Sequence, residues 1–305
     1  MIKYIKELFL SKSFRLKVKK LPVIRVIDES ESEKNWISIR NKIRSLIINN
    51  RIKTFYDWDI LKYYFIVGDN DYIKVEVESI RQSPGFLRYA SALQDTNYIK
   101  LHNSQYFFGS NPNRIHHAYH IQQFEDSTSL NINDFDFIFE FGGGYGNLCH
   151  YVRSLGYKGK YVIFDCPELI LLQEYYLKNS GLKFKMMSKK LRSMKNNVNY
   201  GVSEINILND LSVNFNRGLF IGTWSISETS LSFREEFLNN IFIKKFHNYL
   251  LAFQKTFDET DNVTYFNEWL QHNEFRNYIY KEIGHIPQAF SQYLFVIDKD
   301  ISSGF

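Results

Sequence analysis

From residue 136 onward, short apolar runs alternate with longer stretches whose apolar positions recur at helical spacing. The runs expected as strands are 137–141, 160–164, 218–223, 249–254 and 291–298, with a further strand at 183–187 or 198–202. A helix is predicted over 148–155. Strands that alternate with helices indicate a parallel α/β sheet, in which ligands bind at the carboxyl ends of the strands.

The first hundred or so residues have a different pattern. Apolar positions recur every three or four residues in 36–47, and the pattern of 55–67 also fits a helix, whereas 71–80 fits either a strand or a short helix. The sequence shows no internal repeat and no low-complexity linker. We therefore expect a mainly helical N-terminal extension over 1–104 and a second domain over 105–305.

Three histidines lie together on a predicted helix. Asn111 and Pro112 indicate the start of this helix, which is expected to run to about residue 125. His116, His117 and His120 cluster on it, because residues three and four apart share a face. Histidine suits proton transfer near neutral pH, although such clusters are more often packing or surface features. His116 and His120 have the spacing of H-E-x-x-H ligands, but His117 replaces the Glu and no third ligand is evident, so we predict no metal.

The most distinctive motif follows the first predicted strand. It combines an acid with closely spaced glycines: Glu140, Gly142, Gly143, Gly144 and Gly146. Glycine has no Cβ and tolerates positive φ, so the backbone can turn sharply and approach a ligand closely. The spacing is not that of a dinucleotide motif, because Asn147 stands where a third small residue is needed, and the Gly-Lys-Ser/Thr of a phosphate loop is missing. The motif therefore disfavours NAD and ATP.

At these residues the chain resembles the class I S-adenosylmethionine-dependent methyltransferases, whose first motif is an acid followed by alternating glycines. More narrowly, EFGGGYGNL, YVIFDCPEL and LFIGTWSISET resemble segments of the sugar O-methyltransferases found with bacterial surface-polysaccharide genes. The resemblance covers roughly residues 105–300. It implies a Rossmann-like sheet, mostly parallel with an antiparallel last strand, and S-adenosylmethionine as the cofactor.

The resemblance also implies how the cofactor is bound. The glycine turn would lie under the methionine part, and Glu140 would bind near its ammonium group. Asp165 ends the next apolar strand, where a carboxylate can accept both ribose hydroxyls; alone, it would be interpreted as a helix N-cap. Ser203, Glu204 and Asn206 are candidates for the adenine contact by their order in the chain. A loop without a role is an equally good interpretation of that segment.

The segment after the predicted strand at 218–223 should border the transferable methyl group. Its candidates are Thr223, as a cofactor contact, with Trp224, Ser225 and Glu228. Ser225 and Glu228 also fit a capping box. Transfer to a hydroxyl requires a base that takes its proton. We predict that one of the three clustered histidines is this base, with Glu228 as the acidic alternative. Candidates to line the acceptor pocket are His285, Pro287, Tyr265, Trp269 and His272, although an aromatic stripe such as the last three is more often part of the core.

Composition and charge bear on the size of the core, the kind of ligand and the cellular location. With 44% hydrophobic and 17% aromatic residues the chain can bury a large core, and its net charge of +5 fits an anionic sugar nucleotide as well as ordinary solubility. Two cysteines without a C-x-x-C pair, and no recognisable secretory signal or membrane span, predict a cytoplasmic protein. The basic segment 1–22 fits either a packed helix or a peripheral contact with an anionic membrane.

The predicted function is thus S-adenosylmethionine-dependent O-methylation of a sugar hydroxyl in a surface polysaccharide, such as O-antigen or capsule, or in its nucleotide- or lipid-linked precursor. One alternative is an N- or O-methyltransferase of a non-sugar small molecule. The other is a binding subunit with an inactive methyltransferase fold. Nucleic acid is not expected as a partner, because basic residues beyond the N-terminus are dispersed. The sequence predicts no oligomeric state.

Overall fold

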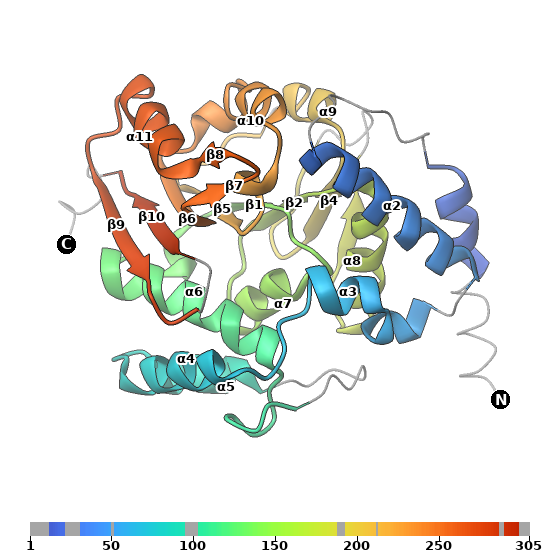
Figure 1. Ribbon diagram of the computed structural model, residues 1–305, viewed down its shortest axis with the longest axis horizontal. Coiled ribbons are helices and arrows are strands. Elements are labelled where there is room, and N and C mark those ends of the chain that lie inside the picture. Colours follow the sequence, from blue (N-terminus) through green and yellow to red (C-terminus); the bar gives the residue numbers. More distant parts are fainter. Residues whose placement is uncertain are drawn as a thin grey trace.

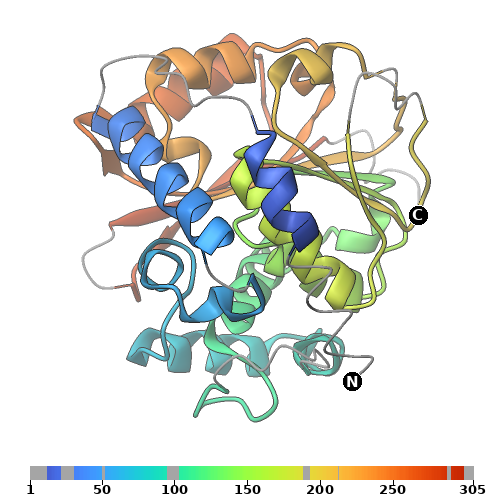
Figure 2. The same cartoon turned by 90° about the vertical axis from the view of Figure 1, so that its right-hand side faces the viewer.

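The structure is a computed structural model that describes residues 12–21, 31–49, 52–94, 103–187, 193–211, 213–286 and 290–298. Its centre is an eight-stranded sheet with helices on both faces (Figures 1 and 2). The strands are β1 Phe137–Phe141, β2 Lys160–Phe164, β3 Phe184–Met186, β4 Asn199–Val202, β5 Gly218–Thr223, β6 Asn248–Gln254, β9 Tyr278–Ile283 and β10 Ser291–Val296. Two short strands, β7 Thr256–Phe257 and β8 Thr260–Asp261, form a separate hairpin.

The order of the strands in the main sheet is β3-β4-β2-β1-β5-β6-β10-β9. The first six strands in this order pair in parallel, while β10 is antiparallel to both β6 and β9. The predicted α/β fold is therefore confirmed, with its mostly parallel sheet and an antiparallel last strand. Both alternatives for the third strand, 183–187 and 198–202, contain a strand.

The order of strands reverses at β1. The chain passes from β1 outward through β2 toward β4 on one side, and later continues on the other side of β1 with β5 and β6. In an open sheet of this kind a crevice forms outside the carboxyl ends of the strands at such a switch point. The glycine turn directly after β1 lies there.

The helices lie on both faces of the sheet and, in the N-terminal region, also outside these two layers (Figure 1). They are α2 Glu31–Asn49, α3 Asp59–Tyr64, α4 Asp71–Gln82, α5 Phe86–Leu93, α6 Pro112–Thr128, α7 Asn147–Ser154, α8 Pro167–Asn179, α9 Ile205–Asn209, α10 Leu231–Leu238 and α11 Asn262–His272. Alternate residues of β1 divide between two hydrophobic cores: Ile138 packs in the core that includes α6 to α8, and Phe139 in the core with α9 to α11. The predicted start of α6 is confirmed, since the Asn111 side chain accepts the N–H of Arg114.

The N-terminal region is helical, as predicted, and the strand alternative for 71–80 is wrong because α4 occupies it. Buried residues of this region, among them Ile43, Phe55 and Ile73, belong to the same hydrophobic core as α6 to α8. In addition, the fully buried Glu168 of α8 pairs with Arg40 and Arg44 of α2. The boundary at residue 104 stays a prediction.

The basic segment near the N-terminus is described from residue 12 to residue 21, and residues 12–19 are helical. Phe14 and Val18 are buried, and Lys17 Nζ lies 2.6 Å from a carboxylate oxygen of Glu174 on α8. This part of the segment is therefore packed against the protein. Membrane contact stays a prediction that rests mainly on residues 1–11, outside the described part. No helix within the described ranges is long and apolar enough to cross a membrane.

Candidate functional site

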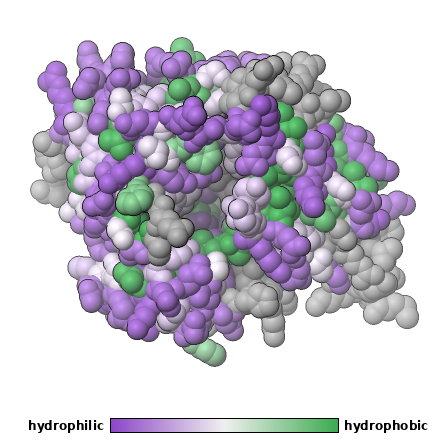
Figure 3. Space-filling view, viewed as in Figure 1, coloured by the Kyte–Doolittle hydropathy of each residue, from purple (hydrophilic) through white to green (hydrophobic). Residues whose placement is uncertain are grey.

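A cavity of about 1030 Å³ lies outside the carboxyl ends of β1, β2, β4 and β5. A hollow is visible near the middle of the face shown in Figure 3. Its lining includes the glycine turn, the ends of these strands and parts of α2, α3 and α6. The volume is at the upper end of the range of small-molecule and cofactor sites, so a nucleoside-sized group and a second molecule can fit together.

The glycine turn is restricted by its backbone conformation and, at Gly142 and Gly143, also by space. Gly142, Gly144 and Gly146 have φ values of +72°, +56° and +96°. A Cβ on Gly142 would lie 2.4 Å from the Cβ of Ser225, and one on Gly143 would lie 2.5 Å from Ile163 Cγ2. Gly142, Gly143 and Gly144 line the cavity, whereas Gly146 caps the start of α7. The turn thus presents backbone to the cavity, as the sequence motif predicts.

Glu140 lies at the end of β1 beneath this turn. Its carboxylate accepts a hydrogen bond of 2.8 Å from the Tyr161 hydroxyl and is 4% exposed. Burial raises the pKa of Glu140 to about 7, and the bond from Tyr161 opposes this only in part. A cation beside Glu140 would favour its ionised form, which fits the ammonium contact implied by the sequence.

Asp165 joins the end of β2 to the glycine turn. Its Oδ2 accepts the N–H of Gly144 at 3.0 Å and the amide of Gln173 at 2.9 Å, and its Oδ1 accepts the N–H of Cys166 at 2.7 Å. Burial raises its pKa well above the ordinary value. Cys166, not Asp165, occupies the N-cap position of α8, so the N-cap interpretation is wrong. Asp165 lines the cavity, and its ribose contact stays a prediction.

The remaining predicted cofactor residues come from two other strands. Ser203 and Glu204 follow β4, and Thr223 is the last residue of β5; all three line the cavity. Asn206 lies in α9. The structure therefore places candidates from four strand ends around one cavity, while the individual contacts stay predictions.

The histidine cluster divides into two parts. His116 and His120 contact each other, with 3.1 Å between their Nε2 atoms, and the indole N–H of Trp224 lies 3.3 Å from each Nε2. His116 Nδ1 is 2.7 Å from Glu76 Oε1, and His120 Nδ1 is 2.6 Å from the Tyr293 hydroxyl. These two histidines are thus buried in a hydrogen-bond network, of which only His116 and Trp224 line the cavity.

Glu76 anchors this network and was not identified from the sequence. It is fully buried, and although burial alone would raise its pKa, the contacts with His116 and His285 lower it below the ordinary value. His285 Nε2 lies 3.1 Å from Glu76 Oε1, so this candidate for the acceptor pocket belongs to the network too. The available signal was a carboxylate on the apolar face of α4, three residues after Ile73 and one before Val77.

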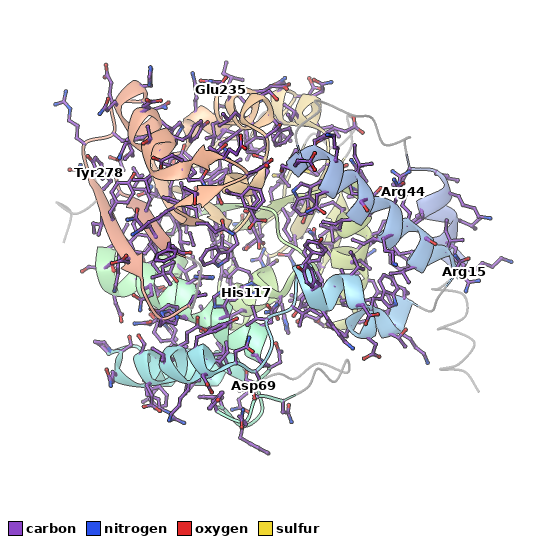
Figure 4. The ribbon with its side chains drawn as sticks, in the orientation of Figure 1. Arg15, Arg44, Asp69, His117, Glu235 and Tyr278 are labelled. Atoms are coloured by element: carbon purple, nitrogen blue, oxygen red, sulfur yellow. The ribbon has the colours of Figure 1, made fainter. Side chains whose placement is uncertain are left out.

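His117 lies on a different side of α6. It is half-buried, lines the cavity and lies near the centre of the view in Figure 4. Its Nδ1 is 2.8 Å from Nδ2 of Asn147, the first residue of α7. Burial lowers the pKa of His117 to about 3, and nearby His116 and Arg114 contribute. His117 is therefore neutral near neutral pH.

Glu228 faces the cavity after β5. Its Oε1 accepts a bond of 2.7 Å from the Gln254 amide, and burial raises the pKa of Glu228 to about 7. A carboxylate with this pKa can exchange protons efficiently near neutral pH. The capping box with Ser225 is not formed, because Ser225 Oγ donates instead to the carbonyl oxygen of Phe141 at 2.7 Å. Among the described residues, no cluster of three or more His, Cys, Asp or Glu side chains could hold a metal ion.

Together, the sheet order and the glycine turn define a Rossmann-like α/β protein with a ligand cavity at the switch point. No protein-family model matches the chain, and the search of curated proteins finds no match. Matching solved structures include the glycopeptide N-methyltransferase MtfA complexed with sinefungin, at 8% identity and a TM-score of 0.39, over 58% of this chain and 84% of that one.

Two other matching solved structures are also described as methyltransferases. The Podospora anserina methyltransferase PaMTH1, bound to S-adenosylhomocysteine, is 10% identical with a TM-score of 0.37, over 90% of this chain and 100% of that one. The magnesium protoporphyrin IX methyltransferase of Synechocystis PCC 6803, with bound S-adenosylmethionine, is 12% identical with a TM-score of 0.36, over 73% of this chain and 95% of that one. Similarity at this level carries no information about the substrate.

Proposed function

We propose that the protein is an S-adenosylmethionine-dependent methyltransferase. The observation that carries the proposal is the contact between Asp165 Oδ2 and the N–H of Gly144, which joins a ribose-binding candidate to the glycine turn at the wall of the cavity. The turn fits the methionine part of this cofactor because it presents backbone instead of side chains to the cavity; a Cβ at Gly142 would collide with Ser225, and one at Gly143 with Ile163 of β2. Glu140 would hold the ammonium group. When bound, the cofactor supplies an electrophilic methyl group on sulfur.

The acceptor is proposed to be a sugar hydroxyl of a surface polysaccharide or of its nucleotide- or lipid-linked precursor. The narrower sequence resemblance supports the sugar, and the cavity offers aromatic faces, including Trp36, Tyr72 and Trp224, on which a sugar ring can pack. Glu228 supports a hydroxyl over an amine. A sugar hydroxyl is a weak acid whose proton must be removed, and Glu228 has a pKa suited to that step.

Within this proposal Glu228 takes the proton of the acceptor hydroxyl at its carboxylate, while Gln254 orients that carboxylate. Trp224 and His116 form the neighbouring wall of the cavity. Because burial raises its pKa to about 7, Glu228 can both lose and take up a proton near neutral pH. We therefore propose Glu228, the acidic alternative, as the base in place of one of the histidines.

Calorimetric titration with S-adenosylmethionine and S-adenosylhomocysteine tests the cofactor. We expect both to bind the wild type and neither to bind Asp165→Ala with comparable affinity. Asp136→Ala is a matched control, because Asp136 also accepts two backbone N–H groups, those of Asn216 and Arg217, but at the opposite end of β1. A wild type that binds neither ligand would refute the proposal. So would full affinity in Asp165→Ala.

The acceptor is tested by mass spectrometry of surface glycans from cells with and without the protein. The proposal predicts that, only when the protein is present, a methyl group replaces a hydroxyl hydrogen of the sugar, which raises its mass by that of CH₂. The same experiment with Glu228→Gln should lose that methyl group. A methylated amine in place of a methylated sugar hydroxyl would support the alternative, an N-methyltransferase.

A further inference from the structure

Two hydrogen bonds hold α6 against the glycine turn. Asn113 Nδ2 donates to the Tyr145 hydroxyl at 2.9 Å, and one helical turn later His117 Nδ1 lies 2.8 Å from Nδ2 of Asn147. Tyr145 and Asn147 are the two neighbours of Gly146 in the chain. The His117 ring is therefore fixed beside the end of the turn, at the start of α7, and it lines the same cavity.

The partners of Asn147 define which nitrogen of His117 carries the proton. The Tyr176 hydroxyl lies 3.2 Å from Asn147 Oδ1 and 2.9 Å from His150 Nδ1, and we take its proton to be donated to Asn147, an arrangement in which the amide Nδ2 faces His117. An amide N–H only donates, and His117 Nδ1 must accept. Because His117 is neutral, its single proton lies on Nε2. Within the described residues Nε2 has no hydrogen-bond partner, so it offers an N–H to a ligand in the cavity.

We propose that His117 binds the carboxylate of the methionine part of the cofactor through its Nε2–H. The inference rests on the proposed function, and it makes His117 a cofactor ligand in place of the catalytic base considered from the sequence. A protonated Nε2 cannot take a proton from an acceptor, but it can donate to an anion. The start of α7 adds the partial positive charge of a helix N-terminus at the same place.

Arg114, a positively charged residue of α6, forms its hydrogen bonds away from the cavity. Arg114 is fully buried, and its guanidinium donates to the carbonyl oxygen of Ala92 and to Ser154 Oγ. It therefore supplies no hydrogen bond to the cavity. His117 is the side chain on this helix whose free N–H and position beside the glycine turn both suit a carboxylate.

Two ligands that differ only in the carboxylate test the inference. S-adenosylhomocysteine carries the group, and decarboxylated S-adenosylhomocysteine keeps the amine but lacks it. In calorimetric titrations we expect His117→Leu to lower the affinity for S-adenosylhomocysteine by about tenfold to a hundredfold, the range for the loss of a hydrogen bond to a charged group. The affinity for the decarboxylated ligand, measured by competition where it is weak, should stay within about twofold. His117→Gln, whose amide N–H can replace Nε2–H, should restore most of the loss.

The outcomes separate the two proposals. If the wild type binds neither ligand, the proposed function fails. If the wild type binds S-adenosylhomocysteine, and His117→Leu lowers the affinities for both ligands equally or lowers neither, the role of His117 is refuted while the proposed cofactor is retained. Should His117→Leu not fold, nitrogen NMR of histidine-labelled wild type replaces it, with His117→Gln for assignment. The inference requires a protonated Nε2 whose signal moves with S-adenosylhomocysteine and not with the decarboxylated ligand; an unprotonated Nε2 overturns it.

Discussion

Replacing Gly142 with alanine tests whether the glycine turn is restricted by backbone conformation alone or also by space. Gly142 has a φ of +72°, and a Cβ there would lie 2.4 Å from the Cβ of Ser225. Ser225 is held in place, because its side chain is buried and its Oγ donates to the carbonyl oxygen of Phe141. Gly181 is a matched control, with a φ of +78° and no atom within 4 Å of its Cβ position.

The two substitutions share one cost and differ in another. An alanine in the left-handed region costs about 1–2 kcal/mol at either position. The contact with Ser225 adds a second cost at Gly142, and overpacking of a filled site typically takes about 1–3 kcal/mol. We therefore expect the free energy of unfolding to fall by about 1–2 kcal/mol in Gly181→Ala and by about 2–5 kcal/mol in Gly142→Ala.

Urea denaturation measures these free energies, and titration with S-adenosylhomocysteine measures the consequence for the site. Since the turn in Gly142→Ala must shift away from Ser225, we expect its affinity to fall by about tenfold or more, whereas Gly181→Ala should bind like the wild type. Equal free energies of unfolding in the two variants, together with unchanged affinity in Gly142→Ala, would refute the steric argument.

Three further predictions concern buried carboxylates. Burial raises the pKa of Glu140 to about 7, so folding favours its protonated form, and the free energy of unfolding of the wild type should fall as the pH rises from about 5 to 8. In urea denaturation over that interval, the stability of Glu140→Gln should increase relative to that of the wild type. Glu168→Leu leaves Arg40 and Arg44 without their shared carboxylate. Calorimetry should show that the free energy of unfolding falls by about 2–4 kcal/mol, less than for a fully buried pair because the arginines are partly exposed. Glu228→Gln should slow methyl transfer to a glycan extract by about a hundredfold or more without weakening S-adenosylhomocysteine; undiminished transfer would return the base role to His116.

The buried strands of the sheet could be predicted from sequence because both of their faces are covered. β1 and β2 are mainly apolar, with Glu140 and Lys160 as their charged residues, and their predicted bounds agree with the structure. β9 was missed for the opposite reason. It is an antiparallel edge strand, largely solvent-accessible, and it includes exposed Lys281 and Glu282, so it has no apolar run to detect.

The site was predictable where a motif lies within one element and its flanking turn, and not where it depends on packing between elements. The glycine turn and Asp165 lie around one cavity as the sequence indicated. The histidine cluster shows the limit. Successive residues of a helix are rotated by about 100°, so His117 faces the glycine turn while His116 and His120, four residues apart, contact each other. Which side of α6 meets which neighbour is a property of the fold.

Trp224 shows why the helical N-terminal region belongs to the site. Its φ of +53° is unusual for a bulky residue and costs about 1–2 kcal/mol, which other contacts must offset. The backbone N–H of Trp224 donates to the carbonyl oxygen of Ala252, and its indole N–H reaches His116 and His120. His116 is in turn held by Glu76 of α4. A carboxylate of the N-terminal region thus helps to fix the ring at the end of β5, and the conformation of this cavity wall depends on both predicted domains.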